Sequence, residues 1–139
     1  MKLIGIDYGR RRIGLAVTDE TGTVVRGLAT IDRKKNPDCR AALAAAIAAE
    51  RPEAAVFGLP LDASDGETAM SAEVRAFAAD FEKDALGARL PVYFVDESLT
   101  SKKAADLMRF RKKKVRRDKS TTDRIAACLI LEQFLRENK

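Results

Sequence analysis

Two short, uninterrupted apolar runs, AAVFGL at residues 54–59 and PVYFV at 91–95, constrain the fold of this chain most strongly. A continuous apolar run of this length is typical of a strand that is covered on both faces. Between the two runs, apolar residues recur with helical spacing and predict an amphipathic helix that ends near Leu86. A strand, a helix and a second strand in this order indicate a parallel crossover in a sheet that carries helices on both faces.

The first third of the chain has the pattern of antiparallel strands. Residues 3–7 and 12–18 read as two strands, and residues 23–31 read as a third that follows a short turn. An Asn-Pro pair then predicts an alanine-rich helix with Asn36 as its cap, and Pro52 marks the expected end of that helix.

The remaining segments complete one α/β domain that spans residues 1–139. A short helix is expected over 100–108 and a final helix over 122–136, with a basic segment between them. The three N-terminal strands pair antiparallel and the two later strands add in parallel, which gives a mixed five-stranded sheet. A chain of 139 residues is long enough to bury an ordinary core.

Composition excludes several kinds of chemistry. The chain has no histidine and only two cysteines, which rules out Ser-His and Cys-His catalysis, a disulfide framework and most zinc sites. No apolar run approaches the roughly 20 residues that cross a bilayer, and the N-terminus leads into a strand rather than a signal peptide. We therefore expect a cytoplasmic protein without a membrane partner, whose chemistry depends on carboxylates, lysines or water.

Carboxylates lie where the ends of two strands are expected to meet. Asp7 ends the first strand and Asp96 and Glu97 end the last, and both strands are expected to be central, on either side of a switch point where α/β sheets form their sites. Asp123 opens the final helix on the apolar stripe that faces the sheet. Like charges in a partly dry site repel one another unless a cation lies between them. Oxygen ligands without His or Cys favour Mg²⁺ or Mn²⁺.

Each of these acids also has a simpler interpretation. Asp7 could be a buried acid that pairs with one of the three arginines of the following turn. The two acids at the end of the last strand could be ordinary polar strand ends, and Asp123 could favour the positive end of the helix dipole. The metal site is the preferred interpretation because all of them fall at one end of the predicted sheet.

One segment carries the excess of positive charge. Residues 109–119, RFRKKKVRRDK, hold eight basic residues and one acid in a chain whose net charge is +5. A cluster of this density favours contact with phosphates over a merely solvated surface, and its lack of apolar periodicity predicts a mobile loop over 109–120 that orders on binding. The residues expected to contact nucleic acid are Arg10, Arg11, Arg12, Lys112, Lys113, Lys114, Arg116, Arg117 and Lys119.

Four segments, in this order, resemble the YqgF/RuvX family of bacterial proteins: IDYGRRRIGLAVTD, VFGLPLDASDGE, VDESLTS and TTDRIAACLIL. The resemblance implies a ribonuclease H-like fold and a relationship to Holliday-junction resolvases. It also implies a nuclease, to which processing of the 5′ end of pre-16S rRNA in ribosome biogenesis is usually assigned. The acidic set of the family matches Asp7, Glu97 and Asp123 here, and the role of Asp96 stays open.

Two positions depart from the related patterns. Ser98 stands where the family commonly has an arginine, which removes one phosphate contact but no metal ligand. The strand over 54–59 ends in Gly-Leu-Pro, without the acid that the resolvases proper carry there. The second departure disfavours the cutting of DNA junctions.

The sequence thus predicts an endonuclease that uses Mg²⁺ or Mn²⁺, held by Asp7, Glu97 and Asp123, to hydrolyse phosphodiester bonds in structured RNA. The alternatives are a Holliday-junction resolvase-like endonuclease that acts on branched DNA, and a non-catalytic RNA-binding module of ribosome assembly. An actin-like or sugar-kinase fold also opens with an Asp-Gly hairpin, but it needs a second lobe, for which the chain is too short. Monomer and homodimer both remain open.

Overall fold

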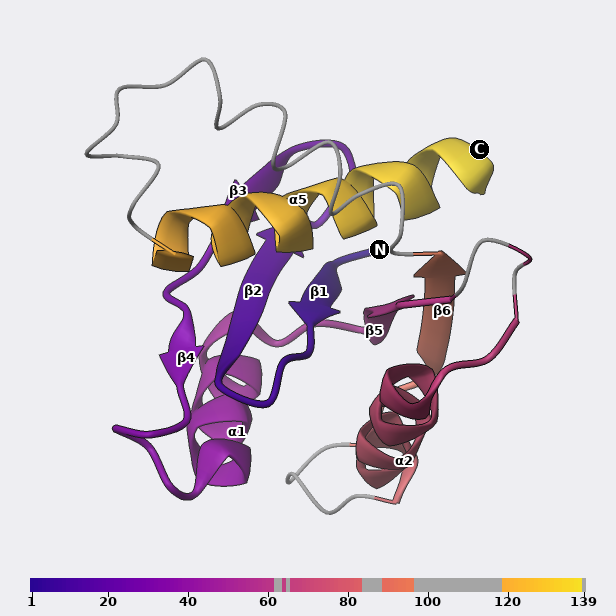
Figure 1. Cartoon of the computed structure of the whole chain (residues 1–139). Helices are drawn as coiled ribbons and strands as arrows, with labels where there is room; N and C mark the ends of the chain where they lie inside the picture. Colours follow the sequence, from indigo (N-terminus) through magenta and orange to yellow (C-terminus); the bar gives the residue numbers. More distant parts are fainter. Residues whose placement is uncertain (62–63, 65, 84–88, 97–118, 139) are drawn as a thin grey trace.

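The computed structural model describes residues 1–61, 64, 66–83, 89–96 and 119–138, and for residues 119–122 it describes the backbone alone. A mixed sheet forms the middle layer (Figure 1). Helices α1 (Cys39–Glu50) and α2 (Ala69–Glu82) cover one face, and helix α5 (Lys119–Glu137) crosses the other. The prediction of helices on both faces of a mixed α/β sheet is therefore confirmed. No helix in these described ranges is long and apolar enough to cross a membrane.

The sheet combines antiparallel and parallel pairing as the sequence predicts. Five strands form its main path, in the spatial order β3 (Val25–Gly27), β2 (Arg12–Thr18), β1 (Leu3–Asp7), β5 (Ala54–Leu59) and β6 (Val92–Asp96). The short strand β4 (Ile31–Asp32) pairs with β2 outside this path. Strands β1, β5 and β6 run parallel, so that their carboxyl ends lie at the same edge of the sheet.

The prediction of a single strand over residues 23–31 is wrong, because β3 and β4 are separate, and the described residues form six strands rather than five. Gly27 lies opposite Ala16, and Ile31 lies opposite Ile13. Residues 13–16 of β2 therefore face residues 27–31 of the partner segment, four residues against five. The extra residue interrupts the pairing of this segment with β2, at a point between β3 and β4, in the manner of a β-bulge.

The expected positions of β6 and of the first helix cap also need correction. Within the described residues, β6 is the edge strand and β5 separates it from β1, so β6 is not central. Only β5 is buried along its whole length, whereas Tyr93 of β6 is 41% exposed. Asp38 caps α1 in place of Asn36, because its carboxylate accepts the N–H of Ala41, while Asn36 bonds to the carbonyl of Asp32.

The helices differ from their predicted bounds by a few residues. Helix α2 ends at Glu82, before the predicted end near Leu86, and α5 begins at Lys119, three residues before its predicted start. Pro52 follows the left-handed residue that caps α1, as expected. The predicted short helix over 100–108 lies outside the described residues.

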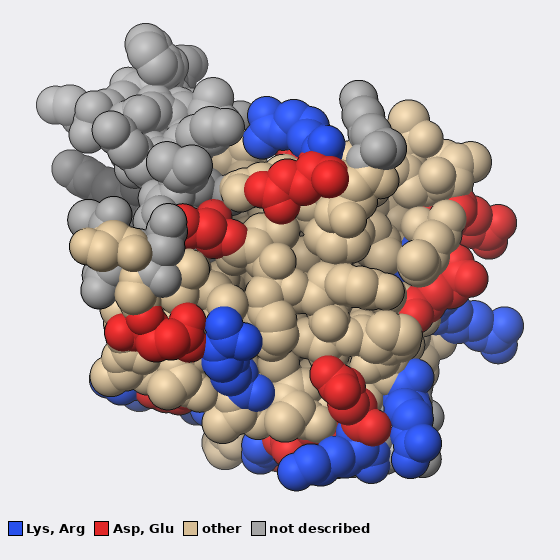
Figure 2. Space-filling view, turned by 90° about the vertical axis from the view of Figure 1, so that its right-hand side faces the viewer, with Lys and Arg blue, Asp and Glu red and all other residues tan. Residues whose placement is uncertain are grey.

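The face beside the β6 edge carries few charges at its centre. Figure 2 views the molecule from the side of β6 and α2, and the described surface there is mostly uncharged, with acidic and basic side chains along its margins. The described charges of this face are thus scattered and of both signs.

Glycines on neighbouring strands allow α5 to lie close to the sheet. A Cβ atom at Gly5 would stand 2.6 Å from Cγ of Leu131, closer than real Cβ contacts occur. A Cβ atom at Gly14 would collide with the backbone carbonyl of Asp123. Both Ala127 and Leu131 are fully buried against the sheet. The predicted apolar stripe of the last helix therefore packs as expected, and the absence of a side chain at Gly5 and at Gly14 sets its distance from the sheet.

We expect Gly5→Ala to destabilise the protein by about 1–3 kcal/mol, because the new methyl group overpacks the contact with Leu131. Urea unfolding of the single and double variants measures the effect. Combining Gly5→Ala with Leu131→Ala should lose less stability than the sum of the two single changes, since the colliding side chain is then gone. A Gly5→Ala variant as stable as the parent would show that α5 does not need this close approach.

Candidate active site

Asp7 lies at the carboxyl end of β1 and faces α5. Side chains alternate along the strand, and Ile4 and Ile6 belong to the core beneath α1 and α2. Leu3 belongs to the core beneath α5. Asp7, four residues beyond Leu3, therefore points to the α5 side of the sheet.

Asp123 lies near Asp7 because both residues are neighbours of Gly14. Gly14 is the cross-strand partner of Asp7 in the ladder of β1 and β2. The backbone of Asp123 lies directly against Gly14, where a Cβ atom has no room. Asp123 is also the fifth residue of α5 rather than a first-turn residue, which weakens the interpretation that it merely complements the helix dipole.

The two carboxylates influence each other in a partly dry environment. Burial, and then the negative charge of Asp123, raise the pKa of Asp7 from 3.8 to about 7. Among the described residues, no side chain forms a hydrogen bond or ion pair with the Asp7 carboxylate. The neighbourhood of Asp7 thus disfavours its negative charge unless a cation is added.

The arginines that follow Asp7 pair with other acids. Arg12 Nε donates to Oδ2 of Asp123 at 2.8 Å, and both side chains are about a quarter exposed. Arg10 binds Glu73 at 2.9 Å, and Arg11 lies 3.8 Å from Asp32. The simpler interpretation of Asp7, a buried acid neutralised by a neighbouring arginine, therefore finds no support in the described contacts.

The ends of β1 and β6 lie level with each other across β5. Ile6 pairs with Phe57, which pairs with Phe94, so Asp7 and Val95 are each one residue further toward the same edge. Two strand spacings, about 10 Å, separate β1 from β6. The predicted meeting of strand ends at one edge is confirmed, although β5 lies between them.

Of the two acids at the end of β6, the structure describes Asp96. Val95 packs beneath α5, whereas Phe94 packs against the opposite core, so alternation puts Asp96 on the face away from Asp7. Glu97 lies outside the described residues, as do Lys112, Lys113, Lys114, Arg116 and Arg117. Within the described chain, no three acidic, Cys or His side chains are grouped closely enough to hold a metal.

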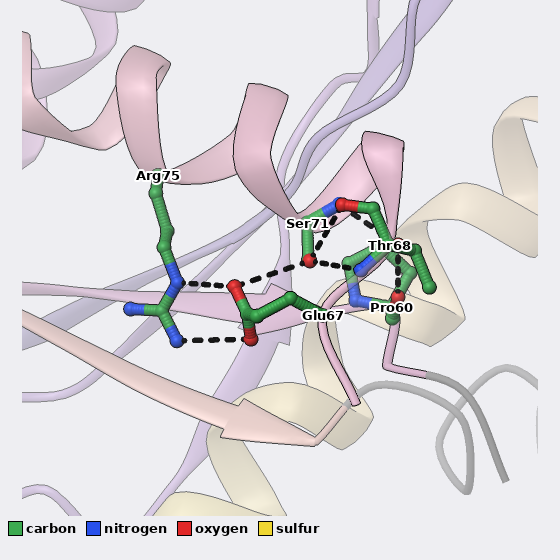
Figure 3. Close-up of polar contacts among 5 residues, drawn as sticks. All are labelled: Pro60, Glu67, Thr68, Ser71 and Arg75. Carbon is green, nitrogen blue, oxygen red and sulfur yellow. Dashed lines mark hydrogen bonds and ion pairs between the residues drawn. The ribbon is translucent and has the colours of Figure 1, made fainter. Parts of the chain in front are cut away.

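Polar contacts fix the start of α2 near the carboxyl end of β5 (Figure 3). The Thr68 hydroxyl donates to the carbonyl of Pro60 at 2.7 Å and accepts the N–H of Ser71 at 3.0 Å. The Ser71 hydroxyl in turn accepts the N–H of Thr68 at 2.7 Å, which completes a capping box. The side chains of Glu67 and Arg75 form an ion pair at 2.7 Å beside it. The loop that leaves β5 is thereby anchored at both ends.

A second polar network has no signal in the sequence. The Tyr8 hydroxyl donates to Glu73 at 2.8 Å and accepts from Arg33 at 3.1 Å, and Arg33 also donates to the carbonyl of Gly9 at 3.0 Å. The guanidinium of Arg33 lies over the Tyr8 ring, 5.2 Å from its centre. These partners are far apart in the chain, and no local spacing in the sequence connects them.

Comparison with known proteins places this architecture in a family. The family model RuvX, described as a Holliday junction resolvase, matches residues 1–137. This chain belongs to the RuvX family. The ribonuclease H-like fold that the sequence predicts is confirmed by the likeness to solved resolvases described next.

Curated relatives of the RuvX-family chain cover almost all of its length. A protein of Synechococcus elongatus is 37% identical, over 98% of this chain and 89% of its own length. A protein of Oleidesulfovibrio alaskensis is 39% identical, over 97% of this chain and 92% of its own length. Both carry the name "Putative pre-16S rRNA nuclease".

Solved structures share the fold of the RuvX-family chain at low sequence identity. The Fowlpox virus resolvase, in complex with Holliday junction DNA, superimposes with a TM-score of 0.64 at 12% identity over 99% of both chains. Thermus thermophilus RuvC gives a TM-score of 0.55 at 22% identity, over 99% of this chain and 97% of RuvC.

The raised pKa of Asp7 predicts how the stability of the metal-free RuvX-family chain depends on pH. The pKa of Asp7 is 3.8 in the unfolded chain and about 7 in the folded protein. Between pH 4 and 7 the unfolded chain therefore loses the carboxyl proton of Asp7 while the folded protein keeps it. The contribution of Asp7 to stability therefore falls across that interval and stays constant above it. We expect Asp7→Asn to stabilise the metal-free protein at pH 8, by a margin on the order of 4 kcal/mol, and to lose this advantage near pH 4.

Urea unfolding of both proteins in the presence of a chelator, over a series of pH values, measures this difference. Asp19→Asn is the matched control, because hydrogen bonds lower the pKa of Asp19 and its removal should act in the opposite direction. A difference between parent and Asp7→Asn that does not change with pH would contradict the raised pKa.

Proposed function

We propose that this protein is a divalent-metal-dependent endonuclease that hydrolyses phosphodiester bonds in structured RNA, and that it processes the 5′ end of pre-16S rRNA. One observation carries the proposal: the carboxylates of Asp7 and Asp123 are neighbours at the carboxyl edge of the sheet, joined through Gly14. The names of the curated relatives support this substrate. We place the protein in the cytoplasm, as a monomer or a homodimer.

The donor groups fit Mg²⁺ or Mn²⁺. Asp7 has no cationic partner among the described residues, and burial together with the charge of Asp123 raises its pKa to about 7. Among the described contacts, Arg12 binds Oδ2 of Asp123 and leaves Oδ1 for a second partner. Carboxylate oxygens in a site without His or Cys are the ligands that hard divalent cations prefer. Asp7 and Asp123 would hold such a cation.

Glu97 is our proposed third ligand, and the family resemblance is the reason for choosing it. In β6, Tyr93 contacts Phe134 of α5 and Val95 packs beneath α5. Both residues thus face the side of Asp7, whereas Asp96 falls on the other side. We therefore assign Asp96 no part in metal binding.

The chain's own residues have distinct tasks in this proposal. A bound divalent metal supplies Lewis acidity and a water of lowered pKa, so that no histidine base is needed. Asp7, Glu97 and Asp123 would hold and orient the cation. Arg12 fixes the rotamer of Asp123 through its hydrogen bond to Oδ2. Arg10 and Arg11, which are more than half exposed, would contact phosphates beside the scissile bond.

Two other functions have a specific observation in their favour. The likeness to a resolvase in complex with Holliday junction DNA favours an endonuclease for branched DNA, although β5 ends in Leu59 without an acid. The ion pair between Arg12 and Asp123 would suit a non-catalytic RNA-binding module in which the arginine replaces the metal. Cleavage assays on RNA and on branched DNA separate all three functions.

We expect Asp7→Asn, Asp123→Asn and Glu97→Gln each to lower Mn²⁺-dependent cleavage of structured RNA by at least about 100-fold, since each removes a charged ligand. Asp96→Asn is the matched control and should retain activity. A parallel assay on a four-way DNA junction tests the resolvase alternative. Full activity of Asp7→Asn in a clean preparation would remove this carboxylate from the mechanism, and loss of activity in Asp96→Asn alone would reverse the assignment on β6.

The basic segment is proposed to hold the nucleic-acid backbone through Lys112, Lys113, Lys114, Arg116, Arg117 and Lys119. Replacing Lys112, Lys113 and Lys114 by alanine should reduce the salt dependence of RNA binding, by about 0.7–0.9 in the log–log slope for each phosphate that is no longer bound. Fluorescence anisotropy at several salt concentrations measures this slope. An unchanged slope would show that these lysines do not contact phosphate.

A further inference from the structure

We propose a second phosphate-binding surface, centred on Lys34 and Lys35, that holds the nucleic-acid strand beside the candidate active site. It is built on two adjacent turns, residues 8–11 and 33–36, which we call the paired turns. This inference rests on the proposed nuclease function and adds a part of the substrate path that neither the basic segment nor the arginines after Asp7 supply.

Arg33 joins the paired turns into one unit. Its backbone N–H donates to the carbonyl of Arg11 at 2.9 Å, which continues the pairing of β4 with β2 into the turns. Its guanidinium reaches across to the carbonyl of Gly9 and to the hydroxyl of Tyr8. Tyr8 itself is buried against Phe77 of α2, with ring centres 4.8 Å apart. The side chain of Arg33 is thus a structural clamp, and the surface cations are carried on a supported backbone.

The acids of this region are engaged by backbone amides or by other arginines. The Asp32 carboxylate accepts the N–H of Lys34 at 3.0 Å, and this bond is the main reason why the pKa of Asp32 is lowered. Asp38 accepts the N–H of Ala41 as the cap of α1. Glu73 is bound by Arg10.

The ammonium groups, in contrast, are exposed to solvent. Lys34 and Lys35 are exposed, and no described acid forms an ion pair with either ammonium group, although the charge of Lys35 contributes to the lowered pKa of Asp32. Arg11 beside them is also largely exposed, and Asp32 lies 3.8 Å from it. Exposed cations on a supported turn, with their neighbouring acids turned to the backbone, are suited to a polyanion. By comparison, the face beside β6 shows scattered charges of both signs (Figure 2).

The paired turns have a suitable position relative to the candidate active site. Asp32 lies opposite Arg12, whose side chain binds Asp123, and Gly14, two residues from Arg12, is the partner of Asp7. Strand spacing and rise put Asp32 on the order of 12 Å from Asp7, and Lys34 and Lys35 follow two and three residues later. Successive phosphates of one duplex strand advance about 3.4 Å along the axis. A strand cut at Asp7 would therefore reach Lys34 and Lys35 roughly four to six nucleotides away.

The test compares the salt dependence of binding for matched variants without divalent metal, so that cleavage does not intervene. Lys34→Ala combined with Lys35→Ala removes the proposed contacts, and Lys34→Arg with Lys35→Arg preserves the charges. Lys83→Ala with Arg136→Ala is the control, because it removes two exposed cations at the far ends of α2 and α5. Fluorescence anisotropy with an RNA duplex, and separately with a DNA duplex of the same sequence, gives the slopes, and thermal unfolding checks that each variant folds.

We expect the double alanine variant to reduce the magnitude of the slope by about 0.9 for each lysine. The arginine variant and the control should keep the parental slope. A reduced slope in one duplex arm alone identifies which nucleic acid uses this surface. The inference would be overturned if the alanine variant kept the parental slope, or if the slope of the control variant fell by the same amount. Either result would leave the proposed metal site unaffected. Conversely, a parent that binds RNA but does not cleave it with Mn²⁺ would overturn the proposed function alone, and failure to bind either duplex would overturn both.

Discussion

The close approach of α5 to the sheet is the constraint on which the candidate active site depends. Gly5 and Gly14 present no side chain to the helix, and Ala127 and Leu131 fill the narrow space between the two layers. Because Gly14 is also the strand partner of Asp7, the contact that packs the helix brings Asp123 to Asp7 at the same time. Packing and chemistry are therefore linked here: a larger residue at either glycine would move a carboxylate as well as a helix.

The same contact creates an electrostatic conflict that the protein resolves only in part. The pKa of Asp7 rises because the carboxyl is buried and because Asp123 is negative. Arg12 binds Asp123, while no described cation pairs with Asp7. An unpaired buried charge is destabilising, so two neighbouring carboxylates with one arginine between them favour a further cation. A divalent cation would relieve the conflict, which is why we interpret the pair as a metal site rather than as an accident of packing.

Much of the fold could be predicted from the sequence, because period-two and period-3.6 patterns of apolar residues report local structure directly. The buried strand Ala54–Leu59 and the inward stripe of the last helix are examples. The bulge between β3 and β4 and the edge position of β6 could not be predicted, since both depend on how distant segments pair. The nearness of Asp7 and Asp123 could be predicted, because Asp7 ends an apolar strand and Asp123 opens the helix stripe that faces the sheet. The clamp formed by Arg33 could not, because its partners share no spacing in the chain.

Diffraction from a crystal soaked in Mn²⁺ would show whether Asp7 and Asp123 share one divalent cation. We expect an anomalous peak at about 2.1 Å from a carboxylate oxygen of each residue, the distance typical of hard cations with oxygen ligands. Density for Glu97 or water would complete the coordination. A crystal with no such peak, in which Arg12 still binds Asp123 and Asp7 stays unligated, would show that the two carboxylates do not form a metal site.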